Sequence, residues 1–180
     1  MIIKSFELEK LNSYDFNLHL IYGNNEGIKE DIIKNNYLKN FSGEVLKYEE
    51  QEILNSKDEF ISSLLTKSLF ENNKLIIISR CSDKLSNLVA EILESEIVET
   101  KIIIKSLNLE KKSKLRNLFE KKRNVVCTPV YEDDNRSLNS VINIFLREQN
   151  INLSQEIKNI LIERSKGDRI NLKNELIKLK

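Results

Sequence analysis

Residues 17–30 read NLHLIYGNNEGIKE, an apolar run that ends at Gly23 and continues into a segment with helical periodicity. A strand, a glycine turn and a helix in this order mark the place where α/β nucleotide-binding proteins carry a phosphate loop. Glycine is scarce elsewhere, since the 180 residues include only 4 glycines and 1 proline. Two of these glycines, Gly23 and Gly27, fall inside this one turn. The turn is therefore the first candidate for a nucleotide site.

A working phosphate loop follows the pattern G-x-x-x-x-G-K-[ST], whose backbone amides and lysine bind phosphate and whose hydroxyl binds Mg²⁺. Gly23 and Lys29 fall in register with this pattern, but Ile28 replaces the second glycine and Glu30 replaces the hydroxyl. A β-branched residue resists the left-handed backbone that glycine permits, and a carboxylate repels phosphate. The strand at residues 74–79 also ends without the acidic pair that holds Mg²⁺ in hydrolytic NTPases. We therefore predict a degenerate phosphate loop without nucleotide, in which Lys29 is a surface residue of the helix.

Apolar strands alternate with helix-period segments along the first 130 residues. The expected strands are residues 17–22, 44–48, 74–79, 101–105 and 124–130, and the expected helices are residues 26–38, 57–70, 83–94 and 110–121. Continuous apolar strands separated by helices indicate βαβ units and a mainly parallel sheet covered on both faces. The fold class is therefore α/β, with a five-stranded, three-layer domain over residues 1–133.

The pattern changes after Pro129, where helical periodicity continues without intervening strands. The expected helices there are residues 138–147, 154–164 and 170–179. The acidic, polar stretch at residues 132–135 is the natural boundary, so we expect a small all-helical domain over residues 136–180. This domain is thin and carries no capping signal at its last helix, as expected for a fragment of something longer.

Charge and cysteine usage exclude several classes of protein. Lys and Arg number 29 and Asp and Glu 28, and a net charge of +1 argues against a dedicated nucleic-acid or polybasic membrane binder. Cys81 and Cys127 lie far apart without Cys or His neighbours, so the sequence predicts neither a zinc site nor a disulfide. The apolar start, residues 1–4, is too short for a signal peptide, and no run approaches the ~20 residues of a membrane span. We expect a cytoplasmic protein without metal or cofactor.

Four smaller features allow two interpretations each. On a helix that runs to residue 70, Phe70 lies nearly opposite the buried face, which suggests a partner pocket; alternatively the helix ends near Ser68 and Phe70 joins the core. Seven basic residues in 111–123 form either a solvated face or a contact to DNA or a neighbouring subunit, with Lys111, Lys112, Lys114 and Arg116 as the candidate residues. His19, the single histidine, is interpreted as structural rather than catalytic. Ser79-Arg80-Cys81 looks like an arginine-finger motif but follows the third strand, so we interpret it as a coincidence.

With these elements placed, the chain resembles the delta subunit of the bacterial DNA polymerase III clamp loader, a member of the AAA+ superfamily. Four stretches carry the resemblance: residues 19–26 at the degenerate Walker A turn, Ser68-Leu69-Phe70 ahead of the strand at 74–78, residues 109–115, and residues 167–179, which resemble the signature G-[ND]-D-x-x-x-L-x-x-E-L-x-K-L. The chain departs from the family in lacking Trp in the first helix of the lid. The family's third, helical collar domain is not expected within these 180 residues.

The resemblance implies an AAA+ or RecA-like domain followed by a helical lid, and a role in DNA replication. It implies that Ser68, Leu69 and Phe70 bind the β sliding clamp and help to open the ring, without ATP hydrolysis by this chain. The implied partners are the clamp, the tau or gamma and delta prime subunits, and primer–template DNA; the chain would be a non-catalytic part of a DNA polymerase. Two alternatives remain: an active P-loop ATPase or nucleotide kinase, and a nucleic-acid-binding module that uses residues 111–123.

Overall fold

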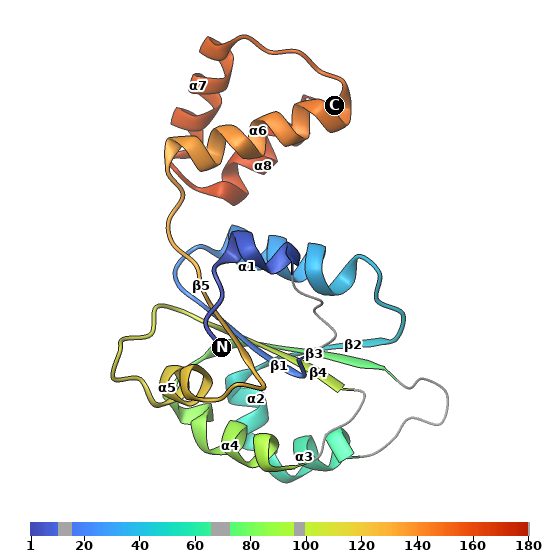
Figure 1. Cartoon of the computed structure of the whole chain (residues 1–180). Helices are drawn as coiled ribbons and strands as arrows, with labels where there is room; N and C mark the ends of the chain where they lie inside the picture. Colours follow the sequence, from blue (N-terminus) through green and yellow to red (C-terminus); the bar gives the residue numbers. More distant parts are fainter. Residues whose placement is uncertain (11–15, 66–72, 96–99, 180) are drawn as a thin grey trace. The chain divides into compact units, whose positions relative to one another are not determined.

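The computed structural model describes residues 1–10, 16–65, 73–95 and 100–179 (Figure 1). The strands are β1 (Leu18–Tyr22), β2 (Glu44–Glu49), β3 (Lys74–Cys81), β4 (Thr100–Ser106) and β5 (Val126–Pro129). The helices are α1 (Glu26–Ile32), α2 (Glu50–Asn55), α3 (Lys57–Leu65), α4 (Ser86–Glu94), α5 (Lys114–Lys121), α6 (Asn135–Gln149), α7 (Gln155–Ser165) and α8 (Arg169–Ile177). Two 3-10 helices, η1 (Ser5–Lys10) and η4 (Asp83–Leu85), and the π-helix η3 (Ile33–Leu38) complete the described elements.

The five strands form one sheet in the order β2-β3-β4-β1-β5, and all four pairs of neighbours are parallel. The predicted five-stranded parallel sheet is therefore confirmed. β1 lies between β4 and β5, with Leu20 opposite Ile104 on one side and Cys127 on the other. The chain leaves β1 toward the β2 edge of the sheet, while β5 lies on the other side of β1. In open α/β sheets, ligands bind at such a reversal of strand order, outside the carboxyl ends of the strands.

Both faces of the sheet are covered. Successive side chains of a strand point to opposite sides, so a strand can pack against elements on both faces. Leu18, Leu20 and Tyr22 of β1 belong to one apolar cluster with residues of α2, α3, α4 and α5. Figure 1 shows these four helices on one face of the sheet. On the other face, His19 of β1 contacts Tyr37 of η3. A strand buried on both faces has no solvated polar face, which explains why its sequence is apolar apart from the buried His19.

The three C-terminal helices are defined by their caps. Asp134 accepts a hydrogen bond from the backbone of Ser137 and forms a capping box at the start of α6. The side chains of Ser154 and Asp168 cap α7 and α8 by accepting from the backbone N–H groups of Ile157 and Asn171. The helices pack around a small apolar core made by Leu138, Ile142, Leu146, Leu161, Ile162, Leu172 and Leu176.

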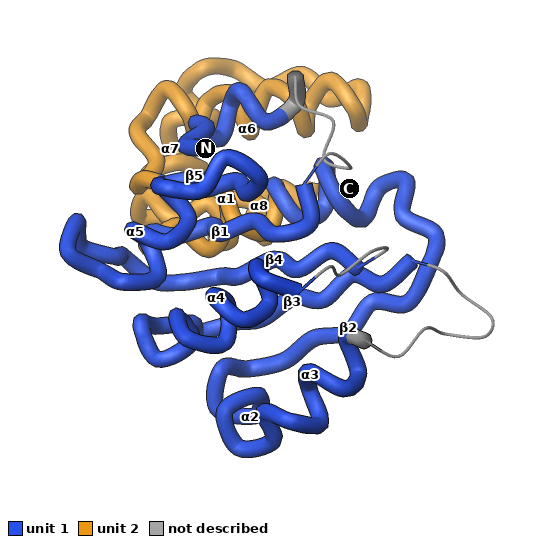
Figure 2. Tube along the Cα trace, turned by 60° about the horizontal axis from the view of Figure 1, so that its bottom comes forward, with its two compact units in different colours: residues 1–23, 32–130 blue, residues 24–31, 131–180 orange. Residues whose placement is uncertain are grey.

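The chain divides into two compact units, coloured separately in Figure 2. The first unit contains residues 1–23 and 32–130, and the second contains residues 24–31 and 131–180. The expected domains, 1–133 and 136–180, differ from these units chiefly because residues 24–31, from the turn after β1, belong to the helical unit. Such a grouping rests on long-range contacts, which hydrophobic periodicity does not report.

Several boundaries differ from the expected ones for local reasons. The helix expected at residues 26–38 changes from α to π winding at Ile33. Helix α5 starts at Lys114 rather than at residue 110, because the Ser113 side chain caps it by accepting from the backbone N–H of Arg116. Helix α2 was not predicted, since six residues are too few to show helical periodicity. Within the described residues, none of the helices is both long and apolar enough to cross a membrane.

Candidate functional site

The turn after β1 begins at a glycine that the structure requires. Gly23 has a φ of +134°, and a Cβ built there would lie 2.0 Å from the carbonyl oxygen of Val130. Its backbone N–H donates to the carbonyl oxygens of Ser106 and Leu107, both at 3.3 Å. The backbone geometry at the carboxyl ends of the strands therefore requires glycine at position 23, whether or not the turn binds a ligand.

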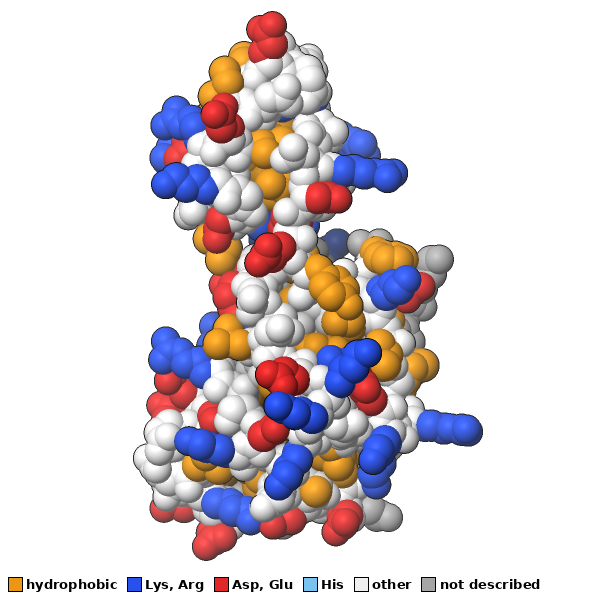
Figure 3. All heavy atoms as spheres, turned by 90° about the vertical axis from the view of Figure 1, so that its left-hand side faces the viewer, with side chains coloured by type: hydrophobic (Ala, Val, Ile, Leu, Met, Phe, Trp, Pro, Cys, Tyr) orange, Lys and Arg blue, Asp and Glu red, His pale blue; other side chains and the backbone are white. Residues whose placement is uncertain are grey.

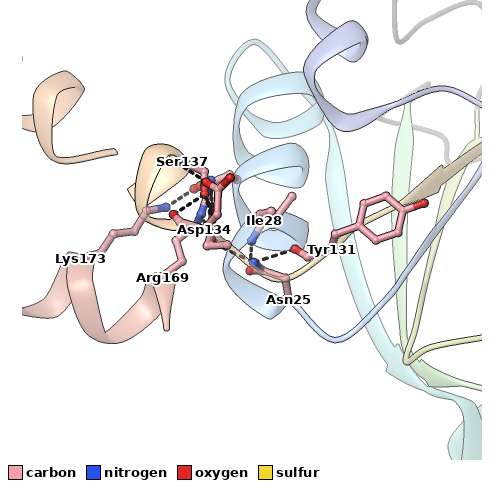
Figure 4. Close-up of polar contacts among 9 residues, drawn as sticks. Asn25, Ile28, Tyr131, Asp134, Ser137, Arg169 and Lys173 are labelled. Atoms are coloured by element: carbon pink, nitrogen blue, oxygen red, sulfur yellow. Dashed lines mark hydrogen bonds and ion pairs between the residues drawn. The ribbon is translucent and has the colours of Figure 1, made fainter. Parts of the chain in front are cut away.

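Asn25 starts the first turn of α1. Its Oδ1 accepts from the backbone N–H of Ile28 at 3.0 Å, while its Nδ2 donates to Asp133 Oδ2 at 2.8 Å and to the Tyr131 carbonyl at 3.1 Å. Figure 4 shows Asn25 between the α1 backbone and the segment that contains Tyr131. The side chain therefore satisfies a helix-end donor and binds a carboxylate in the same position.

Lys29 was predicted to lie on the helix surface, and this prediction is wrong. Its residue exposure is 0%, and its Nζ lies 2.6 Å from Glu26 Oε1, one turn earlier on α1. A buried ammonium requires an acceptor, and the Glu26 carboxylate supplies one. The lysine that a phosphate loop would direct at a nucleotide is here paired with a carboxylate of its own helix.

A cluster of charged side chains in the second unit is centred on Arg169, at the start of α8 (Figure 4). Its Nε and Nη2 donate to the two oxygens of Asp133 at 2.8 and 2.5 Å, and its Nη1 donates to Asp31 at 3.0 Å. Lys173, one turn later on α8, also donates to Asp31. The aliphatic part of Arg169 lies against Gly27, since a Cβ at Gly27 would be 2.8 Å from Arg169 Cβ.

The Asp133 carboxylate is fully buried, with a side-chain exposure of 0%. Burial alone would raise its pKa, but hydrogen bonds from Arg169, Ser137 and Asn25 outweigh burial and hold the pKa below its ordinary value. The group is therefore a carboxylate at neutral pH. In the sequence, Asp133 had been interpreted only as part of a polar boundary.

His19 is buried in a hydrogen-bonded network on the sheet face opposite α2–α5. Its Nδ1 lies 2.5 Å from the Tyr37 hydroxyl, and its Nε2 lies 2.8 Å from Thr128 Oγ1. Burial lowers the pKa of His19 to about 3, so the imidazole is neutral at physiological pH. Both ring nitrogens are occupied, which agrees with the structural interpretation of this residue.

The basic segment at residues 111–123 separates into two kinds of side chain. Arg116 is bound internally: it donates to Glu120 at 2.7 Å and to the Leu109 carbonyl at 3.1 Å, and it stacks over the ring of Tyr22. Lys112 is exposed and pairs with Glu110. The remaining candidate residues, Lys111 and Lys114, are exposed.

Figure 3 shows the side of the molecule on which α5 lies. Lys and Arg side chains alternate there with Asp and Glu and form no single-sign surface. Contact of residues 111–123 with DNA or a subunit stays a prediction. Arg116 is excluded from the candidate residues, because its guanidinium is bound within the chain.

The other chemistry-bearing residues have structural surroundings. Cys81 and Cys127 are buried free thiols, and burial raises the pKa of both. Arg80 is exposed at the end of β3, has a φ of +59° and pairs with Glu49 at 3.0 Å. Over the described part of the chain, His, Cys, Asp and Glu side chains form no cluster that could hold a metal ion.

The predicted clamp-binding residues Ser68, Leu69 and Phe70 lie outside the described residues, between α3 and β3 in the chain. Whether Phe70 joins the core or stays free for a partner is therefore still a prediction. Sequence reasoning missed Asp31, Arg169 and Lys173 altogether. The signal that could have found Arg169 was its place directly after the Gly167-Asp168 turn, at the start of a helix.

Comparison with solved structures finds similar folds in proteins of DNA replication. The clamp loader delta protein (YqeN) of Bacillus subtilis superimposes with a TM-score of 0.65 and 13% sequence identity, over 97% of this chain and 56% of that one. Domain III of the Thermotoga maritima replication initiator DnaA gives 0.50 and 17%, over 97% and 79%. DnaA bound to AMPPCP and single-stranded DNA gives 0.54 and 18%, over 97% and 59%.

These likenesses show that the chain has an AAA+-type α/β fold, as the resemblance implied. The chain spans 56% of the length of the delta protein that it matches. No family model matches the sequence. No curated protein matches it either.

Proposed function

We propose that the chain is a delta-type component of a bacterial replicative clamp loader. It binds the β sliding clamp through Ser68, Leu69 and Phe70, and it helps to open the ring during DNA replication without hydrolysing ATP. The observation that carries the proposal is the likeness in fold to the Bacillus subtilis clamp loader delta protein, which extends over 97% of this chain. The order of the sequence stretches quoted above supports the same family.

The contacts of the degenerate phosphate loop support a role without ATP turnover. Lys29 is bound to Glu26, and Gly27 is covered by the Arg169 stem. Ile28 and Glu30 stand where a second glycine and a hydroxyl are needed. A nucleotide would have to displace Glu26 from Lys29 and the Arg169 stem from Gly27, at the cost of these contacts.

Such a protein would act by differential binding. A ligand shifts a conformational equilibrium only by the difference between its affinities for the two states. A chain that binds the strained, open clamp interface more tightly than the closed one therefore opens the ring with binding energy alone. The tau or gamma subunits would supply ATP hydrolysis, and delta prime and primer–template DNA would complete the proposed assembly, in the cytoplasm.

The test is a titration of the full chain with the β clamp of the same organism. The double variant Leu69→Ala, Phe70→Ala should lose at least about 30-fold in affinity, because even one buried interface anchor contributes about 2 kcal/mol or more. The matched control is Phe6→Ala with Leu107→Ala, which removes two side chains of the same types that are 70% and 63% exposed. The control should bind as the unaltered chain does, and equal affinity of all three proteins would refute the proposal.

The same preparation tests the two alternatives. An active ATPase or nucleotide kinase would bind Mg-ATP and turn it over, whereas the proposed role predicts no turnover by this chain alone. A nucleic-acid-binding module would bind DNA without the clamp, with an affinity that falls steeply as salt rises. Salt-sensitive DNA binding combined with no clamp binding would favour that module.

A further inference from the structure

The cluster around Arg169 joins three parts of the second unit that are far apart in sequence. Asp31 comes from α1, Asp133 follows β5, and Arg169 begins α8. Arg169 contacts both carboxylates, and Lys173 also contacts Asp31. Two cations thus face two anions, so the cluster is neutral and each charge has a partner.

The burial of this cluster separates it from ordinary surface ion pairs. The side chains of Asp133 and Arg169 are 0% and 15% exposed, whereas Arg164 of a neighbouring pair is 67% exposed. Exposed pairs contribute little to stability, but removal of one partner from a buried pair leaves an uncompensated charge and is strongly destabilising. The bidentate geometry of Arg169 on Asp133 also fixes the orientation of both groups.

The same cluster contacts the turn where a phosphate would bind. Asn25 donates to Asp133 at 2.8 Å, and the stem of Arg169 covers Gly27. The anionic groups at the turn and at α1 are therefore carboxylates of the chain itself, Asp133 and Asp31. A phosphate loop binds its ligand because the N-terminus of the following helix attracts negative charge. Here the Asp133 carboxylate supplies the negative charge, and Asn25 donates to it.

We propose that Asp31, Asp133, Arg169 and Lys173 form an internal lock that holds the turn and α1 against the C-terminal helices without a nucleotide. In this unit, ion pairs within the chain hold these segments together, so that no bound nucleotide is needed for it. The arrangement of residues 24–31 with residues 131–180 would then be constitutive and would not respond to ATP. This inference does not depend on clamp binding.

Hydrogen exchange of the full chain, followed by mass spectrometry, tests the lock at peptide resolution. Arg169→Gln keeps part of the stem over Gly27 but removes the charge, and it should speed exchange of residues 26–31 by about tenfold or more, since hydrogen bonds to charged groups are among the strongest. The matched control, Arg164→Gln, removes an exposed arginine of the same unit and should change exchange there by less than about twofold. The β4 peptide, residues 100–106, serves as an internal reference and should not change in either variant.

Two further variants and the addition of Mg-ATP test the lock if Arg169→Gln does not fold. Lys173→Gln removes one ion pair only and should speed exchange of residues 26–31 while β4 stays protected. The double variant Arg169→Gln, Asp133→Asn should exchange no faster than Arg169→Gln alone, because no buried charge remains unpaired. Mg-ATP should leave exchange of residues 26–31 in the unaltered chain unchanged. Unaltered exchange in both Arg169→Gln and Lys173→Gln would overturn the proposal, as would slower exchange on addition of Mg-ATP.

Discussion

The network of Tyr37, His19 and Thr128 makes the stability of the fold depend on pH in a defined window. His19 has a pKa of about 3 in the folded chain, against 6.5 for an unperturbed histidine. The unfolded chain therefore binds a proton more readily than the folded chain below about pH 6.5. The contribution of His19 to stability is complete above that pH and is lost progressively as the pH falls toward about 3.

The size of the loss follows from the two pKa values. One unit of pKa difference corresponds to about 1.4 kcal/mol. Between about pH 7.5 and about pH 5, the linkage relation gives a loss of about 2 kcal/mol in the free energy of unfolding. A loss of this size is a sizeable part of the 5–15 kcal/mol, roughly, that stabilises an ordinary domain.

The structure also explains why His19 should dominate the pH dependence of stability in this window. His19 is the only histidine in the chain. The carboxyl groups with lowered pKa, Asp83 and Asp133 among them, lose their contributions only near and below about pH 4, where aspartate titrates in an unfolded chain. Between about pH 5 and pH 6.5, the slope should therefore report His19 almost alone.

Urea unfolding followed by circular dichroism, at a series of pH values, measures the effect as a shift of the midpoint at constant slope. His19→Gln is the matched variant, because an amide can bond Tyr37 and Thr128 but does not titrate. The variant should show a flat stability between about pH 5 and pH 7, whatever its absolute stability. A flat profile in the unaltered chain, or an equal slope in both proteins, would refute the reasoning.

Two further substitutions test the geometry of the sheet edge and of α5. Gly23→Ala should cost more than about 3 kcal/mol, since its Cβ would meet the Val130 carbonyl at 2.0 Å, whereas Gly167→Ala, with a φ of +76° and nothing within 4 Å, should cost about 1 kcal/mol; equal costs by urea unfolding would contradict this. Arg116→Gln should destabilise the chain by about 1 kcal/mol through loss of its bonds to Glu120 and Leu109, whereas Lys114→Gln should stay within about 0.5 kcal/mol. A larger cost for Lys114→Gln would show that the division of the basic residues is wrong.

The fold was predictable from sequence where burial is strongest. β3 and β4 are buried on both faces, so their apolar runs at residues 74–79 and 101–105 stand out against charged helices. β2 shows a less continuous apolar pattern, because it is an edge strand whose residues are largely exposed. The change from α to π winding at Ile33 was not predicted, because π turns are rare and occur mostly as single-turn bulges inside α-helices.

The candidate site was harder to predict because its contacts cross large sequence separations. Arg169 meets Asp133 and Asp31, which are 36 and 138 residues away. A single sequence contains no measure of such pairing. The error on Lys29 has a related cause: a lysine at a helical position facing polar neighbours is usually solvated, and its burial depends on Glu26 and on the chain around it.

The place of β1 between β4 and β5 has a consequence for synthesis of the protein. β1 leaves the ribosome first of the five strands, yet its pairing partners, such as Ile102 and Val126, are made 84 and 107 residues after Leu18 and His19 respectively. At a translation rate of about 5–20 residues per second, the apolar run of β1 waits about 5–20 s for its second neighbour. During that time its edges can pair with other nascent chains. We therefore expect chaperone binding to the first hundred residues to raise the yield of this protein.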